Sequence, residues 1–155
     1  MLVENLLVAT AMIALTTCVH FFGIAALISF TRRNRFERRT RGPIWLQGAS
    51  ILLVVFGLIF LHTIEIWLYA GLYILLGEFS TWEEALYFST STFTTVGFGD
   101  IVLDPTWRLV AAIESAGGFL LIGWSTAFLV SVTARLGALE AQMVDQLEKR
   151  VENKD

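Results

Sequence analysis

The chain has 155 residues, of which 55% are hydrophobic and only 16% are charged, and this excludes an ordinary soluble domain, which would expose more charge. The length fits one domain, and the single cysteine, Cys18, excludes an intrachain disulfide. The net charge of −3 says little about partners because the two signs are segregated along the chain, and no nucleic-acid partner is expected.

Three segments are apolar enough and long enough to cross a bilayer, which takes about 20 residues of helix. The first occupies 1–31, the second lies within 44–76 and the third within 105–136. The sequence therefore predicts an all-α membrane protein with three transmembrane helices. The expected location is the plasma or inner membrane of the cell.

A basic loop at 32–43 joins the first two spans. Cytoplasmic loops carry an excess of Lys and Arg, which predicts that this loop and the C-terminus lie inside and the N-terminus outside. A voltage sensor would need basic residues at every third position of an apolar helix, whereas these are contiguous and flanked by polar residues. Anionic lipid headgroups are expected to bind them. The basic residues are Arg32, Arg33, Arg35, Arg38, Arg39 and Arg41.

A fourth apolar segment, within 81–94, is too short to span a bilayer at about 1.5 Å per residue. Ser80 or Thr81, together with Glu83 or Glu84, predicts a capping box at its start. Such a half-helix is tolerated at membrane depth only where protein or water surrounds it. It is therefore expected to be re-entrant, with its C-terminal carbonyls directed at the membrane centre, where their partial negative charge favours a cation.

The segment 95–99 has glycines at alternate positions, Gly97 and Gly99, which permits backbone angles that other residues avoid. Successive carbonyls can then point to one side. Four copies around an axis would stack rings of oxygens that replace the hydration shell of a potassium ion, and the Thr95 hydroxyl would add a ring at the inner end. A plain glycine turn would explain the glycines but not the Thr-Thr-Val or the Asp around them.

The run Thr94-Thr95-Val96-Gly97-Phe98-Gly99-Asp100 resembles the signature of the potassium-channel family. The resemblance divides 44–136 into the parts of a pore domain: an outer helix at 44–76, a pore helix at 81–94, the filter at 95–99 and an inner helix at 105–136. It leaves 1–31 as an additional N-terminal helix that the minimal two-span family does not have.

The resemblance implies a passive, potassium-selective channel built from four identical chains, with no enzyme activity and no cofactor besides the transported ion. Three other functions stay open: a non-selective cation channel of the same fold, a non-conducting accessory subunit, and a small membrane enzyme that uses His62 and Glu65. The residues expected to bind dehydrated K⁺ are Thr95, Val96, Gly97 and Phe98.

The filter departs from the common form of the signature at Phe98, where many family members have a tyrosine that bonds to a pore-helix tryptophan. The position of that tryptophan is occupied here by Phe88, with Tyr87 beside it. Because both partners of the bond are absent, no polar group is orphaned. The filter is expected to be braced by packing instead of a hydrogen bond, and to inactivate more readily at low potassium.

The second departure is Ser91, which replaces a pore-helix glutamate that in some relatives pairs with the filter aspartate, so Asp100 needs another partner. Glu114 on the third span is one candidate for a polar brace behind the filter. It could instead bond to Ser115 or to a pore-helix hydroxyl such as Thr92. The expected filter-supporting residues are Asp100, Thr94, Tyr87, Phe88, Ser91 and Glu114.

The third span is expected to begin at Asp104 and Pro105, as N-cap and first helical residue. Three glycines within it are candidates for a gating hinge, because glycine weakens a helix and permits bending, and close helix packing explains them equally well. These are Gly117, Gly118 and Gly123. The last segment, 137–155, predicts a cytoplasmic helix or a solvated tail.

Three ionisable residues, His20, His62 and Glu65, lie inside the apolar spans, where such groups are expensive and often functional. His62 and Glu65 share one helix face, and His20 is expected at a similar depth on the adjacent helix. A proton-sensitive contact and a plain interhelical hydrogen bond both fit. A metal site is not expected, because too few ligands are predicted to converge.

Overall fold

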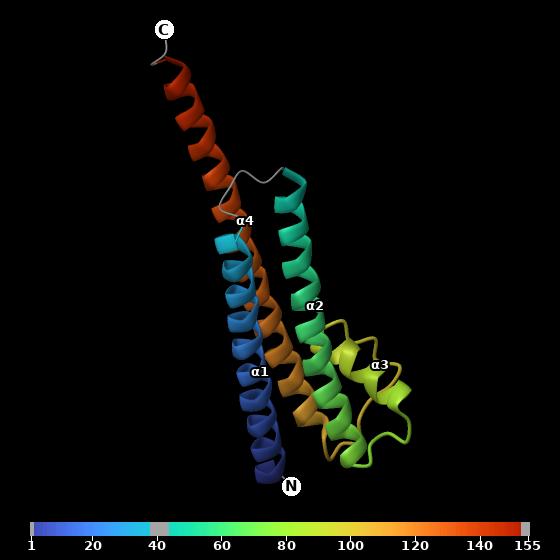
Figure 1. Ribbon diagram of the computed structural model, residues 1–155. Helices are drawn as coiled ribbons and strands as arrows, with labels where there is room; N and C mark the ends of the chain where they lie inside the picture. The colour runs from blue at the N-terminus through green and yellow to red at the C-terminus, as the bar shows by residue number, and fades with distance from the viewer. Residues whose placement is uncertain (1, 38–43, 153–155) are drawn as a thin grey trace.

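The computed structural model describes the backbone of residues 2–37 and 44–152, and the side chains within 2–31 and 48–134. It is helical, with no strand in the described ranges (Figure 1). The helices are α1 (Leu2–Glu37), α2 (Ile44–Leu75), α3 (Trp82–Phe93) and α4 (Arg108–Glu152).

Three of the helices are long and apolar enough to cross a membrane, over Leu2–Thr31, Gly48–Leu75 and Arg108–Ala134. They run lengthwise beside one another. The short α3 lies against α2 near the end of the bundle where the chain's N-terminus is found (Figure 1). Since α3 contacts both α2 and α4, its position depends on how these two spans pack. The expected loop at 32–43 starts too early, because α1 continues as helix to Glu37 and includes the backbone of Arg32, Arg33 and Arg35. The side chains of these three arginines, and all of Arg38, Arg39 and Arg41, lie outside the described residues.

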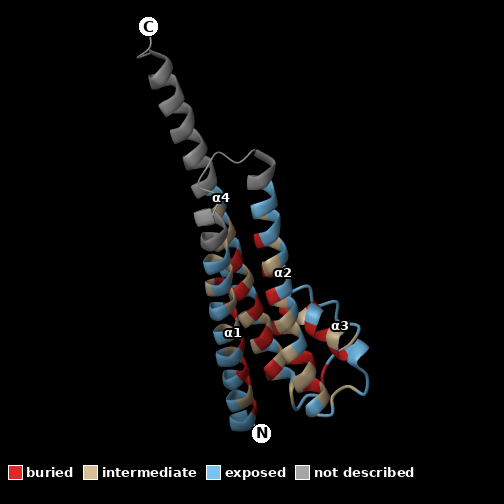
Figure 2. Ribbon diagram, in the orientation of Figure 1, coloured by how far each residue is buried: buried red, intermediate tan, exposed pale blue. Residues whose placement is uncertain are grey.

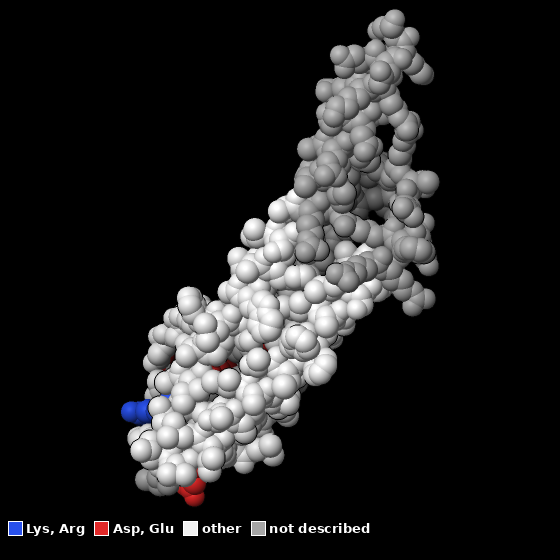
Figure 3. All heavy atoms as spheres, turned by 90° about the vertical axis from the view of Figure 1, so that its left-hand side faces the viewer, with Lys and Arg blue, Asp and Glu red and all other residues white. Residues whose placement is uncertain are grey.

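Many residues on the outer faces of the helices are exposed (Figure 2), large hydrophobic ones among them, and few charged side chains appear on the face that Figure 3 shows. Phe56 and Phe60 on α2 are each 67% exposed, although both are large and hydrophobic. A water-soluble monomer rarely leaves such side chains uncovered over a continuous surface. Lipid, or another subunit, is therefore the surrounding that the outer faces of these helices fit.

The additional helix α1 packs against both α2 and α4. Two glycines make its approach to α2 close: a Cβ on Gly23 would overlap the Leu61 side chain, and a Cβ on Gly57 would overlap Leu27. Small residues that receive a large neighbour are the usual means by which membrane helices approach each other. The exchange runs in both directions, so α1 is held in one register along α2.

The third span begins later than expected, because α4 starts at Arg108 and residues 105–107 form a turn. The Asp104 carboxylate accepts hydrogen bonds from the backbone N–H of Thr106 at 3.0 Å and from its hydroxyl at 2.9 Å. These bonds, the backbone one first, hold the pKa of Asp104 below its ordinary value. Asp104 therefore caps the turn that leads into the helix. At its other end the α4 backbone continues as helix to Glu152, through most of the expected tail.

Candidate functional site

The short helix α3 begins and ends with hydrogen bonds from threonines. The Thr81 hydroxyl accepts from the backbone N–H of Glu84 at 3.3 Å and donates to its carboxylate at 3.1 Å, which makes the capping interaction that the sequence predicts. At the other end the Thr94 N–H and hydroxyl both donate to the Thr90 carbonyl, at 3.1 and 2.7 Å. The chain leaves the helix directly into segment 95–99.

Segment 95–99 alternates in backbone handedness. Thr95, Gly97 and Gly99 have φ angles of 63°, 56° and 77°. A Cβ on Gly97 would meet nothing within 4 Å, and one on Gly99 would only touch the Gly97 carbonyl oxygen at 4.0 Å. Glycine is therefore needed here for its φ angle and not for space. A left-handed, β-branched Thr95 is a strained residue of the kind that concentrates at functional sites.

Ser91 holds the middle of this segment against α3. Its carbonyl accepts from the N–H of Gly97 at 3.0 Å, and its hydroxyl accepts from the N–H of Phe98 at 3.2 Å. The side chain is buried. The residue that stands in place of a glutamate thus bonds to the segment directly. Its two bonds fix the directions of the Gly97 and Phe98 N–H groups.

Tyr87 braces the segment at its Asp100 end. Its hydroxyl donates to the Asp100 carboxylate at 2.8 Å, and its ring stacks on Phe98 with centroids 6.2 Å apart and planes 13° apart. The expectation of bracing by packing alone is therefore wrong, because a tyrosine beside the lost tryptophan position supplies a hydrogen bond. Phe88 points elsewhere and packs edge-on against Tyr73.

Replacing Tyr87 by phenylalanine should keep the stacking on Phe98 and remove the bond to Asp100. If segment 95–99 is the potassium filter that the sequence predicts, the variant should lose potassium flux faster than the parent chain after timed potassium depletion. The bond to Asp100 raises the pKa of Tyr87 above its ordinary value of about 10, so the hydroxyl stays protonated and keeps donating throughout the physiological pH range. The parent chain should lose this brace only when the pH rises above that range, and an equal rate of loss in both chains would contradict the assignment.

Glu114 lies behind α3, where it joins three helices. Its carboxylate accepts from the Tyr73 hydroxyl of α2 and from the Ser89 hydroxyl of α3 at 2.6 Å. All three side chains are fully buried. Glu114 therefore braces α3 and not Asp100, and the α3 hydroxyl that it binds is that of Ser89 and not that of Thr92. Which side chains meet depends on the rotation of each helix about its own axis, and residue spacing does not give that rotation.

Glu114→Ala should destabilise the fold, because it leaves the Tyr73 hydroxyl buried without an acceptor; Ser89 keeps the Ile66 carbonyl, 3.1 Å away. An unsatisfied buried polar group costs about 1–3 kcal/mol. We expect a lower thermal midpoint for the purified protein in detergent. Glu83→Ala, which removes an exposed carboxylate at the start of α3, is the matched control, and equal midpoints for the two variants would refute the role of Glu114.

The three hinge candidates differ in their surroundings. A Cβ on Gly118 would overlap the backbone carbonyl of Phe93, the last residue of α3. A Cβ on Gly117 would be in ordinary contact with Ile13 at 3.6 Å, and one on Gly123 would meet nothing within 4 Å. Close packing therefore accounts for Gly118, which lets α4 reach the end of α3. Bending at Gly117 or Gly123 remains a prediction.

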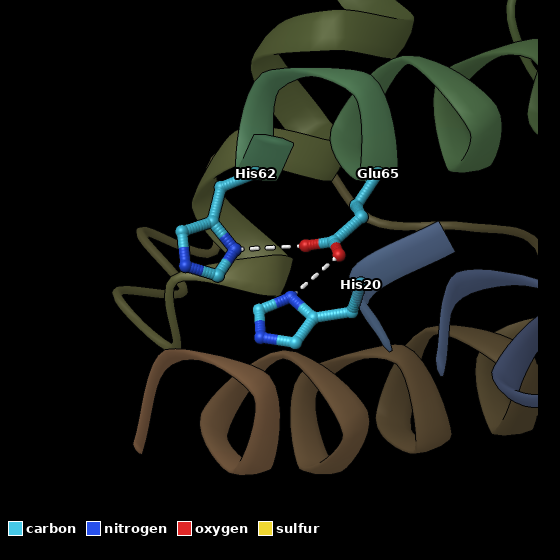
Figure 4. A group of neighbouring side chains, drawn as sticks. All are labelled: His20, His62 and Glu65. Carbon is cyan, nitrogen blue, oxygen red and sulfur yellow. Dashed lines mark hydrogen bonds and ion pairs between the residues drawn. The ribbon is translucent and has the colours of Figure 1, made fainter. Parts of the chain in front are cut away.

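His20, His62 and Glu65 come together in the interior (Figure 4). The Glu65 carboxylate lies between the histidines, with one oxygen 2.9 Å from His20 Nδ1 and the other 2.8 Å from His62 Nδ1. Sequence spacing missed the fourth member, Ser125 of α4, whose hydroxyl oxygen is 3.0 Å from His62 Nε2 and 3.5 Å from His20 Nε2. A lone serine in an apolar helix carries no signal of its partner.

This convergence corrects one expectation. Donor atoms of His20, His62 and Glu65 all lie within 4.8 Å of one another, so the premise that too few metal-ligating groups converge is wrong. The cluster joins α1, α2 and α4, and His20 and Glu65 are fully buried.

Comparison with known families matches residues 49–135, more than half of the chain, to the family described as "Ion channel". An uncharacterized membrane protein of Bacillus subtilis, YdjJ, is 39% identical over 56 residues, 36% of this chain and 16% of that protein. A calcium-gated potassium channel of Thermoplasma volcanium, TvoK, is 34% identical over 77 residues, 49% of this chain and 21% of that protein. The chain thus spans only a small part of the length of these two relatives.

No solved structure matches the chain. The family match covers α2, α3, segment 95–99 and the membrane-spanning part of α4, which are the elements that build the site described above. With three helices able to cross a bilayer, the chain is a multi-pass membrane protein. It belongs to the ion channel family, which its residues 49–135 match.

Proposed function

We propose that the protein is a passive, potassium-selective channel whose filter is the backbone of 95–99. The observation that carries the proposal is the alternation of φ in this segment, with Thr95, Gly97 and Gly99 left-handed. In an ordinary extended strand successive carbonyls point to opposite sides. Left-handed residues at every second position turn them to the same side, as a row of ion ligands requires.

The filter is completed by four copies of the chain, because one chain supplies one strand of carbonyls. Residues 94–100 are exposed in the single chain, and the large apolar side chains of Val96 and Phe98 are 55% and 68% exposed. Exposure of such residues at the end of a half-buried helix fits a surface that other subunits cover. K⁺ would be coordinated by the oxygens of Thr95, Val96, Gly97 and Phe98.

Conduction needs no covalent chemistry from the protein. The C-terminal carbonyls of α3 carry partial negative charge and lie immediately before Thr95, so they favour a cation at the inner end of the filter. The carbonyl rings then replace the hydration shell that the ion loses. The electrochemical gradient alone drives the flow.

The proposed orientation places the arginine-rich segment and the C-terminus in the cytoplasm and the N-terminus outside. It follows from the sequence of 32–41, where six arginines fall. In this orientation α3 enters from outside the cell, since it lies at the same end of the bundle as the chain's N-terminus (Figure 1). Anionic lipids of the inner leaflet would contact these arginines.

Flux measurements test the function directly. Purified protein in liposomes loaded with potassium should let potassium leave down its gradient, with barium block and a clear preference over sodium. Equal permeation of sodium would favour a non-selective cation channel. Absence of flux from protein shown to be tetrameric by crosslinking would favour an accessory subunit, and would refute the proposal.

A further inference from the structure

The polar cluster formed by His20, His62, Glu65 and Ser125 is not part of segment 95–99 and takes no part in the proposed conduction, although the His62 ring lies 5.8 Å, centroid to centroid, from the ring of Phe93 at the end of α3. It draws on three helices: His20 comes from α1, His62 and Glu65 from α2, and Ser125 from α4. Ionisable groups inside a membrane protein are costly unless they are paired or bound. Both histidines of the chain are in this one cluster.

We propose that the cluster is a binding site for a divalent transition metal of the zinc class, held by His20 Nδ1, His62 Nδ1 and the Glu65 carboxylate. The two imidazole nitrogens already face the carboxylate at 2.9 and 2.8 Å (Figure 4). Zinc binds histidine nitrogen and carboxylate oxygen at about 2.0–2.2 Å. Tetrahedral ligands at that radius are roughly 3.3 Å apart. To admit the ion, the two nitrogen–oxygen separations must widen, and any wider separation within the set, which spans up to 4.8 Å, must close.

The far sides of the two rings support the same assignment independently. A histidine that binds metal through Nδ1 carries its proton on Nε2, and such N–H groups usually donate to an oxygen that fixes the ring. Here both Nε2 atoms face one acceptor, the Ser125 hydroxyl oxygen, at 3.0 and 3.5 Å. A hydroxyl oxygen has two lone pairs, so Ser125 can accept from both histidines at once.

The donor set also selects the class of ion. Calcium and magnesium prefer shells made of oxygen, whereas two imidazoles with one carboxylate suit zinc and its transition-metal neighbours. Three protein ligands leave a fourth position for water. The charge of the ion would be partly neutralised by Glu65, which is fully buried.

Such a metal would hold α1, α2 and α4 together at one point. If α4 moves when the channel opens, which rests on the proposed function, the ion would restrain that movement. Binding itself does not depend on conduction, so it can be tested on protein that carries no current.

The test uses the full chain, purified in detergent with any polyhistidine tag removed, stripped with chelator and titrated with Co²⁺. We expect one bound ion per chain by elemental analysis, visible absorption bands typical of tetrahedral Co²⁺, and loss of these bands when Zn²⁺ is added. His62→Ala and Glu65→Gln should lower the affinity at least tenfold. Ser125→Ala keeps all three ligands and should weaken binding by about 10–100-fold, the usual effect of removing a partner of a ligating histidine.

Two controls separate this site from other uptake. Cys18→Ser removes the chain's only thiol, and Glu78→Gln removes a carboxylate that bonds to the Asp104 N–H outside the cluster; both should bind as the parent does. No uptake by the parent chain would overturn the proposal whether or not the variants fold. Uptake with the parent's affinity in His62→Ala, or loss of uptake in Cys18→Ser, would overturn it as well. A chain that binds cobalt but passes no potassium would refute the channel function alone.

Discussion

Gly97→Ala is expected to abolish potassium-selective flux. Gly97 has a φ angle of 56°, and a left-handed conformation costs a residue with a Cβ roughly 1–2 kcal/mol. The penalty would recur in each of four subunits at the same ring of the proposed filter. The simplest relief is to flip the peptide, which turns a carbonyl away from the ion path. We expect flux in the liposome assay to fall to the level of empty vesicles, or to lose its preference for potassium over sodium.

The matched control is Gly71→Ala on α2. Its added Cβ would meet only Trp82, at an ordinary contact distance of 3.7 Å, and alanine favours a helix more than glycine does. This variant should conduct as the parent chain does. Because a Cβ on Gly97 meets nothing within 4 Å in the single chain, steric clash within one subunit cannot cause the loss. Normal selective flux through Gly97→Ala would show that the 95–99 backbone is not the filter.

Much of this segment can be predicted from sequence because its requirements are local. Alternate glycines indicate a backbone that needs left-handed angles, and the Thr81 cap is encoded by residues within one turn of it. The φ angles of Gly97 and Gly99 and the capping bonds follow those patterns. The left-handed Thr95 does not, since nothing local favours a β-branched residue there, and only the surrounding packing imposes it.

The partners of the buried polar residues could not be predicted in the same way. Spacing placed Glu114 behind the filter, but Tyr73 and Ser89, which bind it, come from other helices. Choosing between Ser89 and Thr92 requires the rotation of α3 relative to α4. That rotation is set by contacts such as Gly118 against Phe93, which appear only once the helices are packed.

At the start of α4 the local sequence pattern predicts a boundary that the structure does not have. Asp104 and Pro105 fit the first two positions of a helix, yet the Asp104 carboxylate bonds to Thr106 and makes a separate turn. The loop is also tied to the preceding one, because Glu78 accepts from the Asp104 N–H at 2.8 Å. A tertiary contact thus delays the helix until Arg108.

Gly118→Ala should disrupt the pore domain far more than the same change at its neighbour, Gly117. An ideal Cβ on Gly118 would lie 2.9 Å from the Phe93 carbonyl carbon and closer still to the oxygen. These are backbone atoms at the end of α3, so no side-chain rotation relieves the overlap, and α4 must move away from the helix that leads into the filter. Overpacking of this kind costs about 1–3 kcal/mol, which we expect to see as a lower thermal midpoint in detergent and reduced potassium flux.

Gly117→Ala separates packing from bending, because it removes the flexibility of an adjacent glycine but adds a Cβ in ordinary contact with Ile13 at 3.6 Å. If close packing is what Gly118 provides, the Gly117 variant should keep the parent's thermal midpoint while the Gly118 variant does not. If a hinge lies here, both alanines stiffen the helix, and both should change the open fraction of the channel in single-channel recordings at an unchanged midpoint. Overlap with Phe93 requires α3 and α4 to separate, whereas stiffening of α4 does not. Equal midpoints for the two variants would therefore refute the packing role of Gly118.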